Sequence, residues 1–274
     1  VPILGEYREK GSVAAVRELV SRVAGNLGLT VIFITLVIVV ASPLMAAVFA
    51  PSWYMDNPSK FAATSEMLRI TFPYLLFISM TGLAGAVLNS YDRFAVPAFT
   101  PLLLNVTLIF AALIGAPLFD QPAYALAWGV LFAGIIQFIF QLPFLRSIHM
   151  LPMPRVDWQH SGVKKVLALM APAIFGVSVS QINLLLDTVL ATFLPTGSVS
   201  WLYYSDRLSE LPLGVFGIAI ATVILPNLSR HHIAQSNQAF SQTLDWALKM
   251  ILVVVVPAAA ALMLLAEPIL VTLF

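Results

Sequence analysis

The chain has 274 residues, of which 60% are hydrophobic and only 10% are charged, and its mean hydropathy is +0.94. These values exclude an ordinary soluble globular domain, in which about 45–50% of residues are apolar and about 25% are charged. The formal net charge of +1 gives no reason to expect a nucleic-acid partner, and the lack of cysteine excludes disulfides and thiolate metal sites.

The composition predicts an all-α, polytopic membrane protein. A helix that crosses the bilayer needs about 20 mostly apolar residues. Seven stretches of the sequence meet this requirement, with these approximate bounds: 23–50, 70–90, 99–119, 123–146, 166–194, 201–228 and 247–274.

The basic residues predict how these stretches are oriented. Four of them precede the first stretch, and others lie at Arg93 and between Arg146 and Lys165, whereas the opposite loops hold only Lys60 and Arg69. Because loops rich in Lys and Arg stay in the cytoplasm, the first set of loops is predicted to be cytoplasmic.

An internal repeat predicts two lobes. Val1–Leu4 resembles Leu225–Leu228, and Ser42-Pro43 matches Glu267-Pro268 at a near-constant offset. An even number of stretches separates the copies, so the two lobes are expected to run parallel, related by an axis along the membrane normal. The repeat also leads us to expect that the chain is a fragment, with about two helices missing before Val1 and several after its last residue.

Three ionisable residues, Asp206, Arg207 and Glu210, stand in a row within the stretch 201–228. A charge near the bilayer centre costs about 2.5–3.5 kcal/mol, so such residues usually face a cavity, a neighbouring helix or a substrate. Glu210 follows Arg207 by one helical turn and lies on the same face. Arg207 therefore either contacts substrate or pairs with Asp187, which is equally distant from the turn at Gly197.

Asp187 has a second candidate role, because Gln181 and Asn183 lie close to it in the same apolar stretch. Oxygen ligands of this kind suit a hard cation. Alternatively, these three side chains form hydrogen bonds between helices. The three residues alone do not make a metal site that we predict.

The segment Leu88–Asn105 closely resembles the cytoplasmic turn of the MurJ/MviN family, the lipid II flippases of the multidrug/oligosaccharidyl-lipid/polysaccharide exporter superfamily. Asn89, Arg93, Pro97 and Pro101 are among the matching positions. Further segments with the same resemblance are Val1–Tyr7, Pro172–Gln181 and Gly197–Leu208, so that it covers essentially the whole chain.

The resemblance implies that the family fold has fourteen transmembrane helices and that this chain contains about seven of them. Residues 1–150 would be the remainder of the N-terminal lobe, from the end of helix 2 to helix 6. Residues 151–165 would form a cytoplasmic linker between the lobes, and residues 166–274 would begin the C-terminal lobe with helices 7 to 9.

The function implied by the resemblance is flipping of lipid II across the bacterial inner membrane, by alternating access through a cationic central cavity, for peptidoglycan synthesis, cell wall biogenesis and cell shape. Arg207 matches an arginine that lines this cavity in the family, and Ser200, Asp206 and Glu210 complete the expected substrate-binding set. Asn89 and Arg93 would form a cytoplasmic turn or gate.

A transporter of this kind is not an enzyme and needs no cofactor. No P-loop, zincin motif or nucleophile elbow occurs in the sequence, so a membrane potential or a cation gradient, with Na+ as the candidate coupling ion, would supply the energy. The expected partners are lipid II, membrane lipids and other proteins of cell-wall synthesis. The alternatives are a related exporter of a polysaccharide-lipid precursor or a drug by cation antiport, an intramembrane transferase acting on polyprenyl phosphates, and a scaffold without transport.

Overall fold

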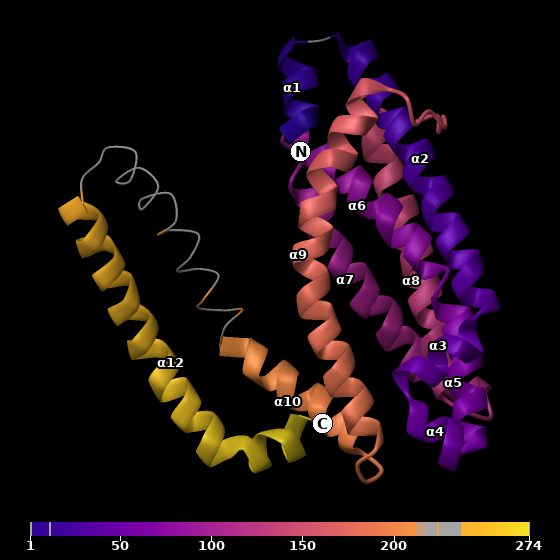
Figure 1. Ribbon diagram of the computed structural model, residues 1–274, viewed down its shortest axis with the longest axis vertical. Helices are drawn as coiled ribbons and strands as arrows, with labels where there is room; N and C mark the ends of the chain where they lie inside the picture. The colour runs from indigo at the N-terminus through magenta and orange to yellow at the C-terminus, as the bar shows by residue number, and fades with distance from the viewer. Residues whose placement is uncertain are drawn as a thin grey trace. The chain divides into compact units, whose positions relative to one another are not determined.

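The computed structural model describes residues 2–10, 12–212, 214, 217, 224 and 237–273. These residues form helices and the loops between them, without a strand (Figure 1). The helices are α1 (Pro2–Lys10), α2 (Val13–Val40), α3 (Ser42–Phe49), α4 (Pro51–Asp56), α5 (Pro58–Thr71), α6 (Tyr74–Ser90), α7 (Ala95–Phe110), the π-helical turn η1 (Ala111–Gly115), the 3-10 turn η2 (Ala116–Leu118), α8 (Ala123–Ser147), α9 (Ser161–Thr192), α10 (Ser198–Pro212) and α12 (Asn237–Leu273).

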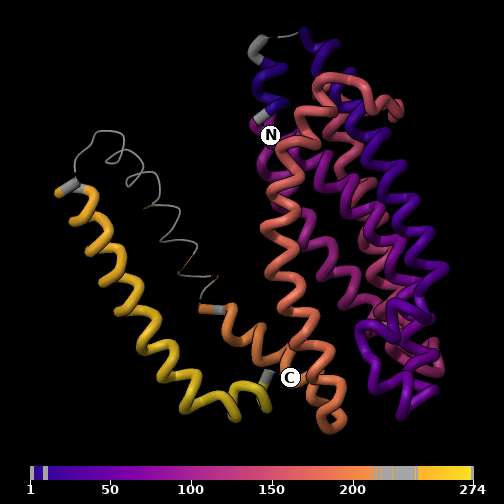
Figure 2. Tube along the Cα trace, in the orientation of Figure 1, coloured from indigo at the N-terminus to yellow at the C-terminus, as the bar shows by residue number. Residues whose placement is uncertain are grey.

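The chain forms two compact units, Val1–Val189 and Leu190–Phe274, which we describe separately. Figure 2 traces the first unit from indigo α1 to α9 and the second through α10 to yellow α12. The last residues of α9 belong to the second unit.

Six helical segments among the described residues are long and apolar enough to cross a membrane: Val13–Val40, Pro58–Ser90, Ala95–Leu118, Ala123–Ser147, Ser161–Thr192 and Phe240–Thr272. They confirm the prediction of an all-α, polytopic membrane protein. The predicted stretch 201–228 begins with α10, but most of its remainder lies outside the described residues.

Prolines explain two interruptions of the helical chain, one between α2 and α3 and one between α5 and α6. Proline lacks a backbone N–H and clashes with the preceding turn. Accordingly, α2 ends at Val40 and α3 starts again with Pro43 in its first turn, while Pro73 is the N-terminal cap of α6. Pro101, by contrast, lies inside α7, where the hydroxyl of Thr100 donates to the Pro97 carbonyl at 2.7 Å and replaces the N–H that Pro101 lacks.

The packed part of the first unit centres on α6 and α8, which contact each other; both also contact α7, and α6 contacts α2. Small residues allow this approach: a Cβ on Gly134 of α8 would lie 2.6 Å from the Tyr74 ring of α6, and one on Gly129 would lie 2.7 Å from Ala111. The Gln137 amide of α8 also donates to the Thr100 carbonyl at 2.8 Å. Close helix packing with interhelical hydrogen bonds is the usual means of assembly in lipid.

Helices α6 and α8 end in the same way. The residues Asp92 and His149 have positive φ angles of 60° and 59°, in the left-handed region. The next N–H groups turn back to the helix, Arg93 to the Leu88 carbonyl at 3.0 Å and Met150 to the Leu145 carbonyl at 2.9 Å. This backward bond closes each helix sharply and satisfies one of its last carbonyls.

The segment after α8 lies against the first turns of α2. The Asn26 amide donates to the Asp157 carbonyl and its oxygen accepts from the Asp157 N–H, both at 2.9 Å. The Arg155 N–H donates to the Ser21 carbonyl at 3.0 Å, and Gly25 leaves room for the Arg155 backbone, which would lie 2.3 Å from a Cβ at that position. The segment between α8 and α9 is therefore held to α2 along its backbone.

Candidate functional site

The polar row predicted from the sequence lies on α10, in the second unit. The chain enters this helix through a turn in which Gly197 has a φ of +109°, a conformation that residues with a Cβ rarely adopt. The Gly197 carbonyl then accepts the Trp201 N–H at 2.9 Å. The turn therefore falls at the glycine that the sequence indicated.

Arg207 and Glu210 form an ion pair, in which an Arg207 Nη donates to Glu210 Oε2 at 2.8 Å. The guanidinium also lies 5.2 Å from the centre of the Tyr203 ring, within the range of a cation–π contact. Both side chains remain open, with 56% of Arg207 and 59% of Glu210 exposed. The pair holds the guanidinium in position and leaves its other N–H groups available.

Asp206 and Ser200 lie on the same helix and are also exposed. Neither side chain makes a hydrogen bond or an ion pair with any residue that the structure describes. Helix α10 begins at Ser198, whose hydroxyl donates to the Pro195 carbonyl at 2.8 Å, so Ser200 lies in the first turn and does not cap the helix. Their roles toward substrate remain predictions.

The three predicted polar residues of α9 do not share one face. Asn183 and Asp187 are four residues apart and so lie one turn from each other, whereas Gln181 is two residues before Asn183 and points to another side. All three are exposed. The described residues contain no cluster of three or more His, Cys, Asp or Glu side chains that would hold a metal. The pairing of Asp187 with Arg207 stays a prediction.

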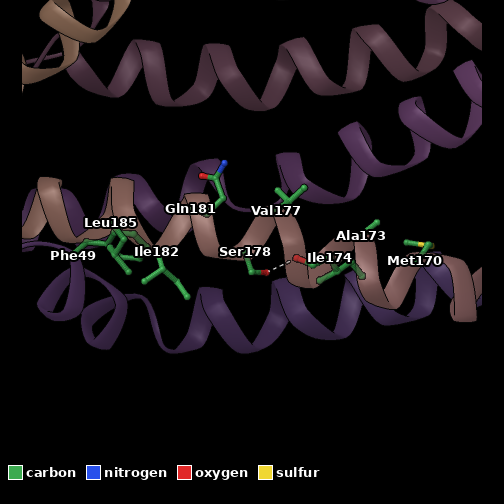
Figure 3. Close-up of a pocket in the computed structure, with 9 residues that line it drawn as sticks. All are labelled: Phe49, Met170, Ala173, Ile174, Val177, Ser178, Gln181, Ile182 and Leu185. Atoms are coloured by element: carbon green, nitrogen blue, oxygen red, sulfur yellow. Dashed lines mark hydrogen bonds between the residues drawn. The ribbon is translucent and has the colours of Figure 1, made fainter. Parts of the chain in front are cut away.

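Gln181 instead lines an open cavity of about 770 Å³ between α9 and Phe49 of α3 (Figure 3). The other lining residues are apolar except Ser178, whose hydroxyl already donates to the Ile174 carbonyl at 2.7 Å. The Gln181 amide is thus the one polar group of this wall that has no partner among the described residues.

The predicted cytoplasmic turn with Asn89 and Arg93 is clamped by α1. Arg8 donates to the Ser90 carbonyl, lies 3.6 Å from Asp92 and stacks 5.0 Å from the centre of the Tyr91 ring. The Asn89 carbonyl accepts the Asp92 N–H at 3.2 Å, while the side chain of Arg93 is exposed. Arg8 is one of the four basic residues that precede the first predicted stretch, and its charge there indicated orientation but not this contact.

The contact between α2 and the segment that follows α8 was likewise not predicted from the sequence. Arg22 pairs there with Asp157 and with Glu18. The signal in the sequence was the group of polar residues Ser21, Arg22 and Asn26 around Gly25, at the start of an otherwise apolar helix. Such spacing places polar groups on one face for a hydrogen-bonded partner.

Six apolar helical segments, close packing through glycines and a charged row on a further helix define a multi-pass α-helical membrane protein. The family model for the lipid II flippase MurJ matches residues 1–274. The chain therefore belongs to the MurJ family of lipid II flippases, which are proteins of the bacterial inner membrane.

Two relatives illustrate the similarity. The probable lipid II flippase MurJ of Haemophilus influenzae is 49% identical over the whole chain, which covers 56% of that protein. The lipid II flippase MurJ of Burkholderia cenocepacia is 40% identical, again over the whole chain, which covers 54% of it. The chain thus spans about half the length of the relatives it matches.

A solved structure has the same fold. The lipid II flippase MurJ in an inward closed conformation matches with a TM-score of 0.77 at 24% identity, over 98% of this chain and 56% of that one. Together with the family match, it confirms the resemblance stated from the sequence.

Proposed function

We propose that the complete protein to which this chain belongs flips lipid II across the inner membrane, and that Arg207 contacts the substrate. The family match over all 274 residues is the observation that carries the proposal. The names of the Haemophilus influenzae and Burkholderia cenocepacia relatives support the same substrate.

The chemistry of the substrate fits the α10 row. Lipid II carries a pyrophosphate between its lipid tail and a polar disaccharide-peptide. The planar guanidinium of Arg207 stays protonated and can hold two phosphate oxygens at once. Its ion pair with Glu210 and its contact with the Tyr203 ring leave it more than half exposed. A pre-positioned cation of this kind can accept the substrate without first breaking a buried contact.

Alternating access between two lobes is the proposed mechanism, and it requires the part of the protein beyond this chain. The pyrophosphate would be shielded from the acyl chains in a cationic cavity while the lobes reorient. Cation coupling, with Na+ as the candidate, would involve Asp187 and Asn183, which share a face of α9. The process moves a lipid without changing its covalent bonds, so the protein acts as a transporter.

The test uses cells depleted of their own flippase and the complete protein at matched membrane levels. Lipid II exposed on the outer leaflet is scored with an external probe for wild type, Arg207→Ala and the control Lys249→Ala. Lys249 forms a similar exposed ion pair, with Asp245 at 2.6 Å, on α12. We expect wild type and Lys249→Ala to restore exposure and Arg207→Ala to fail.

Two other outcomes separate the parts of the proposal. If wild type restores no lipid II exposure, the substrate assignment fails and a related exporter of polysaccharide-lipid precursors or drugs takes its place. If Arg207→Ala restores it as well as Lys249→Ala does, the substrate assignment stands and Arg207 has a structural role only.

A further inference from the structure

A basic pocket lies at the start of α2, in the first unit. Its volume is about 650 Å³, and its walls come from the first turns of α2 and from the segment that follows α8. Arg17 of α2 and Arg155 and His149 of the segment supply its cationic and imidazole groups. The established family and the proposed flipping of lipid II assign no role to this pocket.

The arginines of the pocket are free to bind an anion. Among the described residues, neither the Arg17 nor the Arg155 guanidinium has a hydrogen-bond or ion-pair partner. Glu18 is the one acidic residue in the pocket wall, and its carboxylate accepts a hydrogen bond from Arg22. Arg22 also pairs with Asp157, so one guanidinium contacts both nearby carboxylates, and Arg17 and Arg155 leave this group of five charges with a net charge of +1.

The wall that carries Arg155 is fixed and not a loose loop. The backbone N–H of Arg155 donates to the Ser21 carbonyl at 3.0 Å, and that of Met153 donates to the Ser21 hydroxyl at 3.1 Å. The left-handed conformation of His149, with φ of 59°, directs the chain out of α8 toward this wall. The two arginines are therefore brought to one pocket by backbone contacts that do not involve their side chains.

The position along α2 indicates the kind of ligand. Charged residues occupy the first turns of α2, and its apolar run follows Asn26, so the pocket lies at the depth of the lipid headgroups. Its many basic neighbours place this end in the cytoplasm, where the leaflet surface is negative. Two guanidinium groups at that depth match the oxygens of a phosphate.

From these observations we propose that the pocket formed by Arg17, Arg155 and His149 binds a phosphate group at the cytoplasmic membrane surface. The phosphate belongs either to an anionic phospholipid or to a soluble phosphate ion. Both sources offer the same negatively charged oxygens to the arginines, and the experiment below distinguishes them.

The test uses the complete protein in neutral detergent, with phosphatidylglycerol as the probe and native mass spectrometry to count bound lipid. Arg17→Gln with Arg155→Gln should weaken binding roughly 30-fold, because each arginine near an anionic group contributes to affinity. Arg17→Lys with Arg155→Lys should retain most of the binding. The control, Arg146→Gln with Lys249→Gln, removes two charges outside the pocket and should change it by less than about threefold.

A second variant tests the pocket without changing its charge. Ala14 lines the pocket and is exposed, so Ala14→Trp should fill it and weaken binding as the glutamine variant does. Unchanged binding by Ala14→Trp or by the glutamine variant overturns the proposal, and so does an equal loss in the control. This variant also decides the question if the glutamine variant does not fold.

A parallel titration with inorganic phosphate identifies the source. If phosphate binds to wild type by calorimetry and displaces phosphatidylglycerol, the pocket takes the soluble ion. If phosphatidylglycerol stays bound in its presence, the pocket is a phospholipid site. Wild type that binds neither probe overturns the proposal, without bearing on whether the protein flips lipid II.

Discussion

Polar side chains interrupt the apolar sequences of both α2 and α10, and the two helices differ in what those side chains contact. On α2, Asn26 is buried and bonded twice to the Asp157 backbone, and Arg22 is paired with Asp157. On α10, the polar and ring contacts of Arg207 with described residues are those with Tyr203 and Glu210 of its own helix. Helix α2 thus has polar partners in a distant segment of the chain as well as Glu18 in its own, whereas the described partners of Arg207 all lie within one turn of α10.

This difference separates a scaffold, the bonded polar groups of α2, from a candidate site, the exposed polar row of α10. A buried polar group without a partner costs about 1–3 kcal/mol, so the groups of α2 must stay bonded and serve the fold. Exposed ion pairs contribute about 0.2–1 kcal/mol, so those of α10 can exchange partners at little cost. A ligand can therefore bind the α10 row without breaking a buried contact.

The largest effect on stability is expected at Gly25. A Cβ there would lie 2.3 Å from the Arg155 carbonyl oxygen, and because this neighbour is backbone, it cannot rotate away. Gly25→Ala should therefore destabilise the complete protein by about 3 kcal/mol, at the upper end of the cost of overpacking. The measurement is the Tm of the purified protein in detergent.

Gly28 provides the matched control on the same helix, one turn later. A Cβ on Gly28 meets nothing nearer than the Met80 methyl at 4.0 Å. Gly28→Ala should be neutral or raise the stability by about 0.5–1 kcal/mol, since alanine favours the helix. Equal Tm values for the two variants would show that the segment after α8 does not lie against Gly25.

A smaller loss is expected for Asn26→Ala. The substitution removes two hydrogen bonds and leaves the Asp157 N–H and carbonyl unmatched, at a cost of about 1–2 kcal/mol. Asn183→Ala is the comparison, because the exposed Asn183 has no partner among the described residues and should not change the Tm. A drop for Asn183→Ala as large as that for Asn26→Ala would contradict the division between scaffold and site.

The membrane-spanning helices could be predicted from the sequence, because spanning a bilayer requires a certain length and an apolar composition of each helix. The start of α2 was predicted ten residues too late, near residue 23, whereas the helix begins at Val13. Its first turns carry Arg17, Glu18 and Arg22, and their polar face is explained only by the segment between α8 and α9. Contacts between residues so far apart in the sequence produce no periodic pattern in the local sequence from which they could be predicted.

The candidate site shows the same limit. The pairing of Arg207 with Glu210 follows from their spacing on a helix, and the structure joins them at 2.8 Å. Gln181, Asn183 and Asp187 are close in sequence, but the helical period turns Gln181 away from the other two. Closeness in sequence indicates a shared site only when the spacing matches the helix.

The smallest effect on stability, and the finest test of the comparison, is expected for Glu210→Gln. The ion pair with Arg207 is more than half exposed, so its loss should change the free energy of unfolding by less than about 1 kcal/mol. Asp245→Asn removes the partner of Lys249 in an even more exposed pair on α12 and should also have a small effect. Only Glu210→Gln should also change the rate of lipid II exposure, because it frees the guanidinium proposed to hold the pyrophosphate. Equal exposure rates for the two variants, at equal stability, would mean that Glu210 is an ordinary surface partner and does not position Arg207 for the substrate.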